Sequence, residues 1–245
     1  MTCAIMQPTY IPWAGFFNLI SRSDVFVFLD NVQLSKQSWQ VRNSILLHGK
    51  QCWLTVPTRR LKLCQKIMDV ELHNKTNWKR KHLASLEHSY RKKPHGKEIL
   101  DLIKQAFSLP VTNLADQNIL IIEAVSKRLG LSAEFVRASE LNIGGPRSEK
   151  LLQICSQLSC NTYISPRGAK KYIDEDGAFE NSSIKLIYQS FEPEPYQQYH
   201  SGEFISHLSI VDVIANLGFE ETKNYIIKGK QSTLASDPSE QFFYP

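Results

Sequence analysis

The sequence lacks most of the marks by which common enzyme and membrane classes are recognised. It contains no Walker-type phosphate loop, no Gly-x-Gly-x-x-Gly and no Gly-x-Ser-x-Gly motif, so the usual nucleotide-fold and hydrolase interpretations have no support. The seven histidines include no His-Glu-x-x-His pair and no close His/Cys cluster, and we predict no metal site. No apolar run approaches about 18 residues, and no basic segment followed by an apolar one opens the chain. We therefore predict neither a membrane span nor a signal peptide.

Disulfide bonding also lacks a pattern. The five cysteines are an odd, widely spaced set without a Cys-x-x-Cys pair: Cys3, Cys52, Cys64, Cys155 and Cys160. With no export signal, this pattern predicts reduced thiols and a cytoplasmic location. Cys3 lies in an apolar segment, where we expect a small buried side chain rather than a nucleophile.

What is present is an ordinary globular composition with an uneven charge. The 245 residues are 42% hydrophobic and 22% charged, with a net charge of +5. Residues 59–104 hold thirteen Lys and Arg against five acidic residues, a balance of +8. Such a region favours a phosphorylated substrate, an acidic partner or nucleic acid. We do not expect nucleic acid, because the aromatic residues among these cations have the spacing of core residues.

Short apolar runs alternate with helical patterns at both ends of the chain. We predict strands at 3–6, 25–29, 134–137, 162–165 and 184–189, and helices at 15–20, 147–158, 169–173 and 207–217, the last closed by Gly218. This alternation predicts an α/β fold with a Rossmann-like, mainly parallel sheet.

The middle of the chain has a different pattern. We predict a β-hairpin at 40–56, a strand at 67–72, and helices at 77–91, 95–107 and 114–129. Asn74 or Thr76 is expected to cap the first of these helices, and Asn113 and Gly130 are expected to bound the third. The predicted organisation is one α/β domain over 1–230 with a helical insertion at about 75–130, followed by a mobile or loosely packed tail at 231–245.

Residues 7–43 hold the densest set of candidate site residues. In α/β sheets the ligand lies outside the carboxyl ends of the strands, where this stretch places its polar residues. Gln7, Tyr10 and Trp13 follow the first strand, and they offer an amide and two aromatic faces for a sugar or a base. Gly15 would allow the backbone to approach a ligand closely. The alternative is a stabilised turn with both aromatic rings packed on the sheet edge.

A second group follows the second predicted strand. Asp30 can act as a base, bind a metal, or hold an amine or sugar hydroxyls. Lys36 and Arg42 can clamp a phosphate or carboxylate. The group also includes Gln33 and Asn43; the latter lies on the opposite face of its strand from Arg42, so the two cannot both be core. The alternative is a surface loop closed by an ion pair of Asp30 with one of the cations.

Three later segments offer further candidates. Gly144-Gly145-Pro146 leads into a helix and could place backbone N–H groups and Arg147 around an anion, or could be a plain turn. Ser165, Arg167 and Lys170 belong to a similar strand-to-helix turn. Asp212 shares a helix face with Ser209, where it either complements the helix dipole or contributes to a site.

The order of these motifs resembles the WbqC-like family of bacterial proteins. The resemblance rests on Gln-Pro-x-Tyr-x-Pro-Trp-x-Gly-Phe-Phe, Ser-Asp-Val-Phe-Val, Asp-x-Val-Gln, a Lys and Arg-Asn, is dense over 5–57, and continues through 163–172 and 208–218. The chain departs from the family at Ser165-Pro166-Arg167, where relatives often have Ser-Gly. Members tend to be encoded among surface-polysaccharide (O-antigen) genes, and the resemblance implies a glycine or related aminoacyl transferase.

From this resemblance we expect an enzyme that transfers an acyl or aminoacyl group to the amine of a nucleotide-linked amino sugar. Asp30 would deprotonate or orient the amine, Lys36 and Arg42 would hold an anionic part, and Gln7 with Tyr10 would position the sugar. The activated donor stays open among an acyl carrier thioester, a CoA thioester and an ATP-derived adenylate. The oligomeric state is also open.

Two alternatives come from other classes. The strand, turn, helix, strand order is similar to the nucleotidyltransferase superfamily that includes pantothenate synthetase, although Trp13 and Phe16 stand near the positions where that superfamily has its motif histidines. This similarity predicts an ATP-dependent nucleotidyltransferase or adenylating ligase. The third hypothesis is a binding protein without turnover that docks an acidic partner, such as an acyl carrier protein, on the basic region.

Overall fold

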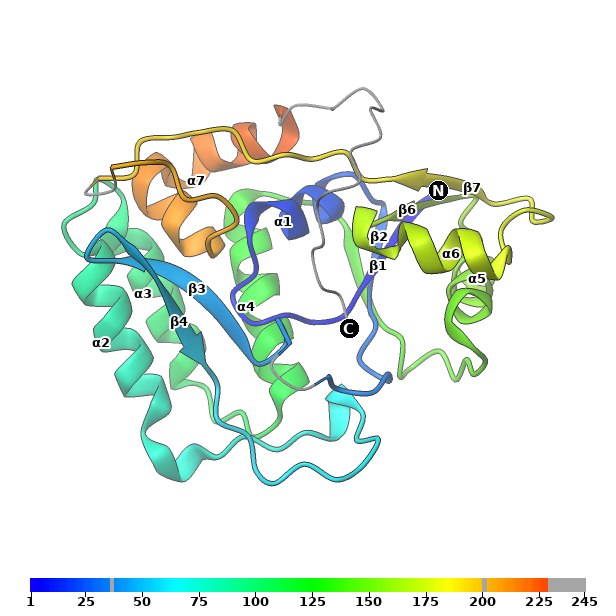
Figure 1. The fold of residues 1–245 in the computed structure, drawn as a ribbon, viewed down its shortest axis with the longest axis horizontal. Helices are drawn as coiled ribbons and strands as arrows, with labels where there is room; N and C mark the ends of the chain where they lie inside the picture. Colours follow the sequence, from blue (N-terminus) through cyan, green and yellow to red (C-terminus); the bar gives the residue numbers. More distant parts are fainter. Residues whose placement is uncertain (36–37, 200–201, 229–245) are drawn as a thin grey trace.

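A single parallel sheet lies at the centre of the fold. The computed structural model describes residues 1–35, 38–199 and 202–228. The sheet order is β5-β2-β1-β6-β7. The strands are β1 (Thr2–Met6), β2 (Val25–Phe28), β5 (Glu134–Arg137), β6 (Thr162–Ser165) and β7 (Lys185–Tyr188), and Figure 1 labels all of them except β5. All four strand pairings are parallel. Counted along the chain this is the order 3-2-1-4-5 of a Rossmann sheet. The predicted α/β fold with a mainly parallel sheet is confirmed.

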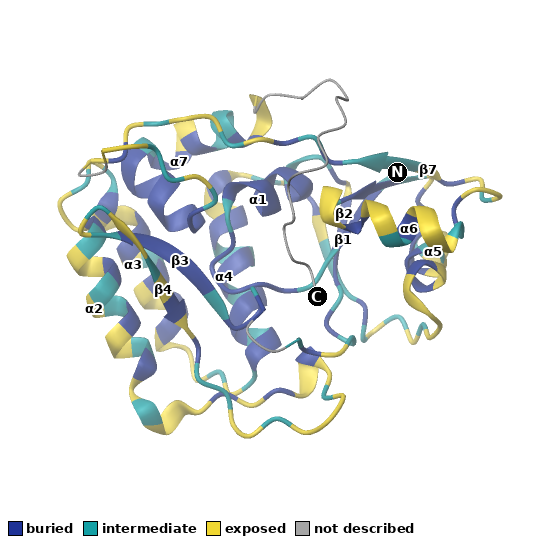
Figure 2. Cartoon of the chain, in the orientation of Figure 1, coloured by how far each residue is buried: buried dark blue, intermediate teal, exposed yellow. Residues whose placement is uncertain are grey.

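Successive strand residues point to opposite sides of the sheet, so both faces carry buried side chains, and helices cover both faces. Ala4, Phe26 and Phe28 face a large core that the helices α1 (Ala14–Ser21), α2 (Trp78–Tyr90), α3 (Gly96–Ser108), α4 (Leu114–Leu129) and α7 (Ile210–Lys228) help to build. Ile5 and Val27 face a smaller core with α5 (Arg147–Gln157) and α6 (Lys170–Asp176). Figure 2 shows the buried inner sides of α1 and α4 beside the sheet.

The predicted hairpin forms a second, separate sheet. Its strands β3 (Arg42–Leu47) and β4 (Lys50–Thr55) pair antiparallel, and His48 and Gly49 turn the chain with positive φ. The hairpin is fastened to α2 by a hydrogen bond of 3.0 Å from the Leu46 N–H to the Tyr90 hydroxyl.

The helical insertion follows the prediction in part. Asn113 accepts hydrogen bonds from the N–H groups of Ala115 and Asp116, and Gly130 ends α4 in the left-handed region, as the cap residues predicted. The predicted cap of α2 is wrong. The N-cap residue of α2 is Asn77, and its side chain makes no capping hydrogen bond. The Asn74 side chain does not cap the helix either, because it accepts from the Trp78 indole N–H.

Two other predicted elements need correction. The strand predicted at 67–72 is a 3-10 turn at Ile67–Asp69, because its N–H groups bond to the loop after β2, Ile67 to Val32 and Met68 to Asp30, rather than to a strand. The last predicted helix begins at Ile210 rather than at 207, and its first part ends at Gly218 as predicted. Gly218 has φ 80, and a second helical segment, which was not predicted, follows it to Lys228. The tail predicted at 231–245 lies outside the described residues.

Candidate functional site

The strand order points to one place on the sheet. In open α/β sheets the ligand crevice lies outside the carboxyl ends of the strands, where the strand order reverses. Here that switch point falls between β1 and β6, which pair in parallel. Gln7 follows β1, and Ser165 is the last residue of β6. The two segments most exposed to a ligand at this point are therefore the turn after β1 and the turn after β6.

The turn after β1 is built around a cluster of three amides, Gln7, Gln40 and Asn118, which we call the amide corner. Gln40 donates from Nε2 to Oε1 of Gln7. Asn118 on α4 donates to the Pro8 carbonyl at 2.9 Å and to the Gln40 carbonyl at 2.8 Å. The amide corner thus holds two loops and a helix together beside the end of β1.

Several polar atoms at the amide corner have unused hydrogen-bonding capacity. Oε1 of Gln40, Oδ1 of Asn118 and the hydroxyls of Thr9 and Ser38 are buried, and they have no hydrogen-bond partner among the described protein atoms. An unsatisfied buried polar group costs about 1–3 kcal/mol. Such groups commonly hold ordered water or a polar ligand. Their concentration beside Gln7 makes this turn the best-supported ligand contact of the sheet edge.

The same turn contains a strained residue. Ile11 is buried and has φ 35, a positive value that is rare for a β-branched side chain. Asn43 holds this conformation, because its amide donates to the carbonyls of Tyr10 and Ile11 at 3.0 Å each. Asn43 also accepts from the Ser44 N–H at 2.7 Å, so its polar atoms are engaged in building the turn. Backbone strain of this kind clusters at functional sites.

The aromatic rings of this turn pack against other side chains, with Tyr10 fully buried and Trp13 partly buried. Tyr10 is fully buried, and its hydroxyl lies 2.8 Å from Nδ1 of His82. The Trp13 ring lies against Phe191. A Cβ added to Gly15 would overlap the Trp13 ring. Tyr10, Trp13 and Gly15 therefore have packing roles in the structure, and we do not assign them to the ligand site.

The end of β2 carries a second polar group. Asp30 is 1% exposed, and its two oxygens accept from the N–H of Ser139 at 2.9 Å and from the hydroxyl of Ser139 at 2.7 Å. Next to it, the Lys150 ammonium donates to Oδ1 of Asn31 at 2.5 Å. Burial lowers the pKa of Lys150, the nearby Lys66 charge lowers it further, and Asp30 opposes the shift. This group ties β2, the loop after β5 and α5 together.

Gln7 and Asp30 therefore lie at the ends of neighbouring strands but contact different partners. Gln7 bonds toward the hairpin, whereas Asp30 bonds toward the loop after β5. Gln33 is exposed and forms a backbone bridge with Lys66. Lys36 lies outside the described residues.

The remaining candidates are spread over the molecule. Ser165 is buried at the end of β6, Arg167 is ion-paired with Glu192 at 3.3 Å, and Lys170 is ion-paired with Asp174 at 2.5 Å. Asp212 is buried in the first turn of α7, which is bonded to the turn after β1 through the Ile210 N–H and the Pro12 carbonyl. Its carboxylate accepts from the Tyr196 hydroxyl at 2.6 Å, and burial raises the pKa of the carboxyl. Of these, the turn containing Ser165, Arg167 and Lys170 is the one at the switch point.

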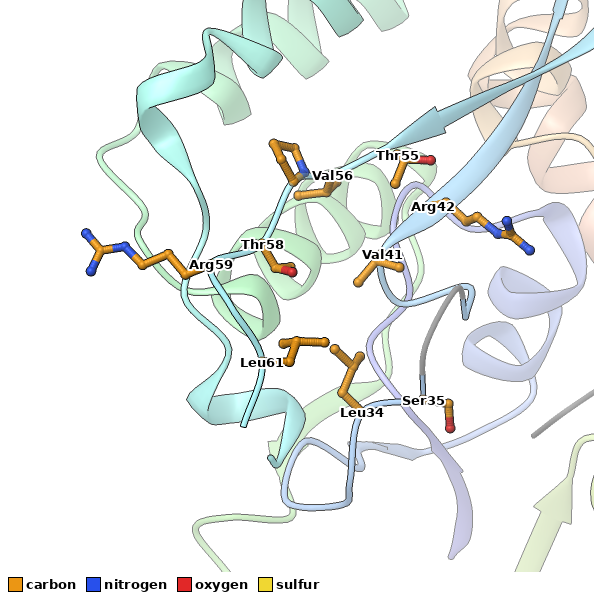
Figure 3. Close-up of a pocket in the computed structure, with 10 residues that line it drawn as sticks. Leu34, Ser35, Val41, Arg42, Thr55, Val56, Thr58, Arg59 and Leu61 are labelled. Carbon is orange, nitrogen blue, oxygen red and sulfur yellow. The ribbon is translucent and has the colours of Figure 1, made fainter. Parts of the chain in front are cut away.

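A pocket of about 650 Å³ opens beside the amide corner. Figure 3 shows Leu34, Val41 and Leu61 pointing toward one another across it. Arg42 also lines it, but its guanidinium stacks over the Trp53 ring at 4.6 Å. Val41 follows Gln40 directly, so the pocket adjoins the amide corner.

Sequence reasoning missed four residues of the sheet edge: Gln40, Asn118, Ser139 and Lys150. Asn118 and Gln40 meet from positions that are 78 residues apart, and no local pattern marks them. Lys150 had one available signal, since it lies in the first turn of the helix entered through Gly144-Gly145-Pro146. In the described part of the chain no group of three or more His, Cys, Asp or Glu side chains could hold a metal ion. Within the same residues, no helix has both the length and the apolar character of a membrane span.

The fold and this edge define an α/β protein of Rossmann order with polar side chains at the switch point. The chain belongs to the WbqC-like protein family, whose sequence model matches residues 7–224. It is 32% identical over 221 residues to the uncharacterized protein Rv1507c of Mycobacterium tuberculosis (strain ATCC 25618 / H37Rv), a match that covers 89% of this chain and 94% of the relative. No solved structure matches the chain significantly.

Proposed function

We propose that the protein is a cytoplasmic transferase that forms an amide on the amine of a nucleotide-linked amino sugar in surface-polysaccharide biosynthesis. The observation that carries the proposal is the amide corner at the switch point of a Rossmann-order sheet. That position suits the nucleotide part of such a substrate. Unsatisfied amide and hydroxyl groups suit the hydroxyl-rich sugar.

Each side of the switch point has a proposed role. Gln7, which is half-buried, holds the sugar, and Gln40 orients it through their hydrogen bond; Thr9 and Ser38 are further hydrogen-bonding groups of the same turn. Arg167 and Lys170 lie after β6, where they favour the phosphates. Arg167 would exchange its exposed ion pair with Glu192 for the substrate, a small loss because exposed pairs contribute little.

Asp30 acts indirectly in this proposal. With 1% of its surface exposed, it contacts Ser139 rather than an incoming amine. We assign it as a positioning residue that fixes the loop after β5 and contributes negative charge near Lys150. Lys36 and Arg42 keep their proposed role at an anionic part of a substrate.

The test is a product assay on the full chain. Purified protein is incubated with nucleotide-linked amino sugars and candidate acyl and aminoacyl donors, and the sugar product is examined for the mass gain of an amide. Gln7→Ala should raise KM for the sugar roughly tenfold with a smaller change in kcat, because it removes a binding group. Gln51→Ala on the exposed strand β4 is the matched control and should leave both constants unchanged. No amide with any donor, or equal constants for Gln7→Ala and the native chain, would remove the proposal.

A second candidate is an ATP-dependent nucleotidyltransferase or adenylating ligase. It is favoured by the strand order and by the cations Arg167 and Lys170 in the turn after β6. Pyrophosphate release that depends on ATP and on an acid substrate would support this candidate. Amide formation from a preformed thioester without ATP would support the first.

A further inference from the structure

Two pockets adjoin at the segment that follows β4. The first, which we call the apolar pocket, has a volume of about 650 Å³, and the second, the basic pocket, about 1010 Å³. They share Thr58 and Arg59 in their walls. A single elongated ligand could therefore occupy both.

The apolar pocket leads toward the proposed sugar site. Its walls include Leu34, Val41, Val56 and Leu61. Leu34 belongs to the loop that leaves β2, and its N–H bonds to the Gln65 carbonyl at 2.9 Å. Val41 lies next to Gln40 of the amide corner. The loop that leaves β2 and the segment that directly follows Gln40 therefore both contribute to the wall of this pocket.

The basic pocket is suited to a phosphate. Arg59, Arg60 and Lys75 line it, with Glu71 as the one acidic group among the described lining residues, and His73 beside them. Arg59 pairs with Glu71 at 2.8 Å, and both side chains are mostly exposed, so the pair is weak and can be exchanged. Figure 3 shows the Arg59 guanidinium pointing away from the apolar pocket. The surrounding segment 59–104, with its balance of +8, adds to the positive field.

We propose that the acyl or aminoacyl donor is a phosphopantetheine thioester that binds across these two pockets. Its phosphate lies among Arg59, Arg60 and Lys75, its pantetheine arm follows the apolar pocket, and its thioester reaches the amide corner. This inference rests on the proposed transferase function and names its donor class. Phosphopantetheine is shared by CoA and by acyl carrier proteins, and the chemistry of the two pockets fits either source.

The reaction is balanced without a further reactant. The neutral amine of the sugar attacks the thioester carbonyl, a C–N bond forms and the C–S bond breaks. The electron pair of the C–S bond leaves with sulfur, the amine loses a proton, and the products are the amide and the free thiol. Neither ATP nor an oxidant is required.

The first experiment measures binding alone, by calorimetry with CoA, 4′-phosphopantetheine and pantetheine. Pantetheine, which lacks the phosphate, should bind at least roughly tenfold more weakly than 4′-phosphopantetheine. The reason is that it cannot form the charge-assisted contacts of the basic pocket. Arg60→Ala/Lys75→Ala should abolish the preference for 4′-phosphopantetheine over pantetheine. Leu61→Gln should weaken both compounds similarly and leave their ratio unchanged.

The control removes the same charge elsewhere. Arg80→Ala/Lys81→Ala changes two exposed cations of α2 that line neither pocket. It should keep the preference for the phosphorylated compound. Equal binding of phosphopantetheine and pantetheine to the native chain, or an equal loss in this control, would overturn the proposal.

The second experiment distinguishes the donors and separates the two proposals. The same acyl group is offered on CoA and on a holo acyl carrier protein, and the better kcat/KM identifies the source; a carrier should also show the steeper loss of rate with added salt. Amide formed from an aminoacyl adenylate while neither thioester binds would refute the donor proposal and leave the transferase proposal standing. Thioester binding without amide on any sugar would refute the transferase instead.

Discussion

The buried pair of Tyr10 and His82 predicts a specific loss of stability in mild acid. His82 is 7% exposed, its Nδ1 lies 2.8 Å from the Tyr10 hydroxyl, and a hydrogen bond with the Thr55 backbone engages the ring as well. We assign the neutral tautomer in which Nε2–H donates to the Thr55 carbonyl and Nδ1 accepts from Tyr10. Burial, only partly offset by the Thr55 bond, lowers the pKa of His82 from 6.5 to about 4.

The sign and size of the effect follow from linkage. The unfolded chain takes up a proton on this histidine near pH 6.5, whereas the folded chain does so only near pH 4. Falling pH within this window therefore favours the unfolded state. Between about pH 7 and about pH 5 this one group should reduce the free energy of unfolding by about 2 kcal/mol.

The assay is urea unfolding at both pH values. His82→Gln cannot titrate, so its loss of stability between the two should be smaller than that of the native chain by about 2 kcal/mol. Tyr10→Phe is the control: it leaves Nδ1 without a donor and lowers stability at both pH values by about 1–2 kcal/mol, but it should retain the pH dependence, because burial is its main cause. Equal losses for the native chain and His82→Gln would refute the assignment of a buried neutral histidine.

Three further substitutions test the site scaffold. Asp30→Ala leaves the N–H and hydroxyl of Ser139 without their carboxylate and should lower the free energy of unfolding by about 2 kcal/mol in urea titrations; an unchanged value would mean that Asp30 does not anchor this loop. Gly15→Ala places a Cβ against the Trp13 ring and should cost about 1–3 kcal/mol and shift tryptophan fluorescence, whereas an unchanged spectrum would contradict the close packing. Asn118→Ala removes two hydrogen bonds to loop carbonyls and should make the turn after β1 a new site of limited proteolysis; unchanged resistance would count against the amide corner as its support.

Local chemistry explains which elements the sequence could predict. Asn113 and Gly130 bound α4 as expected, because cap residues act on the helix end next to them. Residues 67–72 resembled a strand since Ile67, Val70 and Leu72 are apolar and are indeed buried. Whether such a run forms a strand depends on the partners of its N–H groups, and here those of Ile67 and Met68 bond to the loop after β2, 35 or more residues earlier in the chain. No sequence pattern near residues 67–72 predicts this contact with the loop after β2.

The same limit applies to the site. Gln7 and Asp30 were expected near the carboxyl edge and do follow β1 and β2 there, because their place is set by the strands themselves. Tyr10 was ambiguous, since an aromatic ring suits a sugar face as well as a core. In the structure the Tyr10 ring packs against Trp78 and His82, which belong to a helix far along the chain, and so it is a core residue. Asn118 and Lys150 were missed for the corresponding reason, that their partners lie on distant segments.

Strand order is the property that most changes the view of the site. The sequence predicts that Gln7 and Asp30 line one common site, because β1 and β2 are consecutive. In the sheet β1 is central, with β2 on one side and β6 on the other. The reversal of order lies on the β6 side, whereas Asp30 contacts the loop after β5, on the opposite side of β2. A ligand that follows the switch point would therefore meet Gln7 and the turn containing Ser165 and Arg167 directly. Asp30 would influence it through the loop it holds, which is the reason for assigning it a positioning role rather than that of a base.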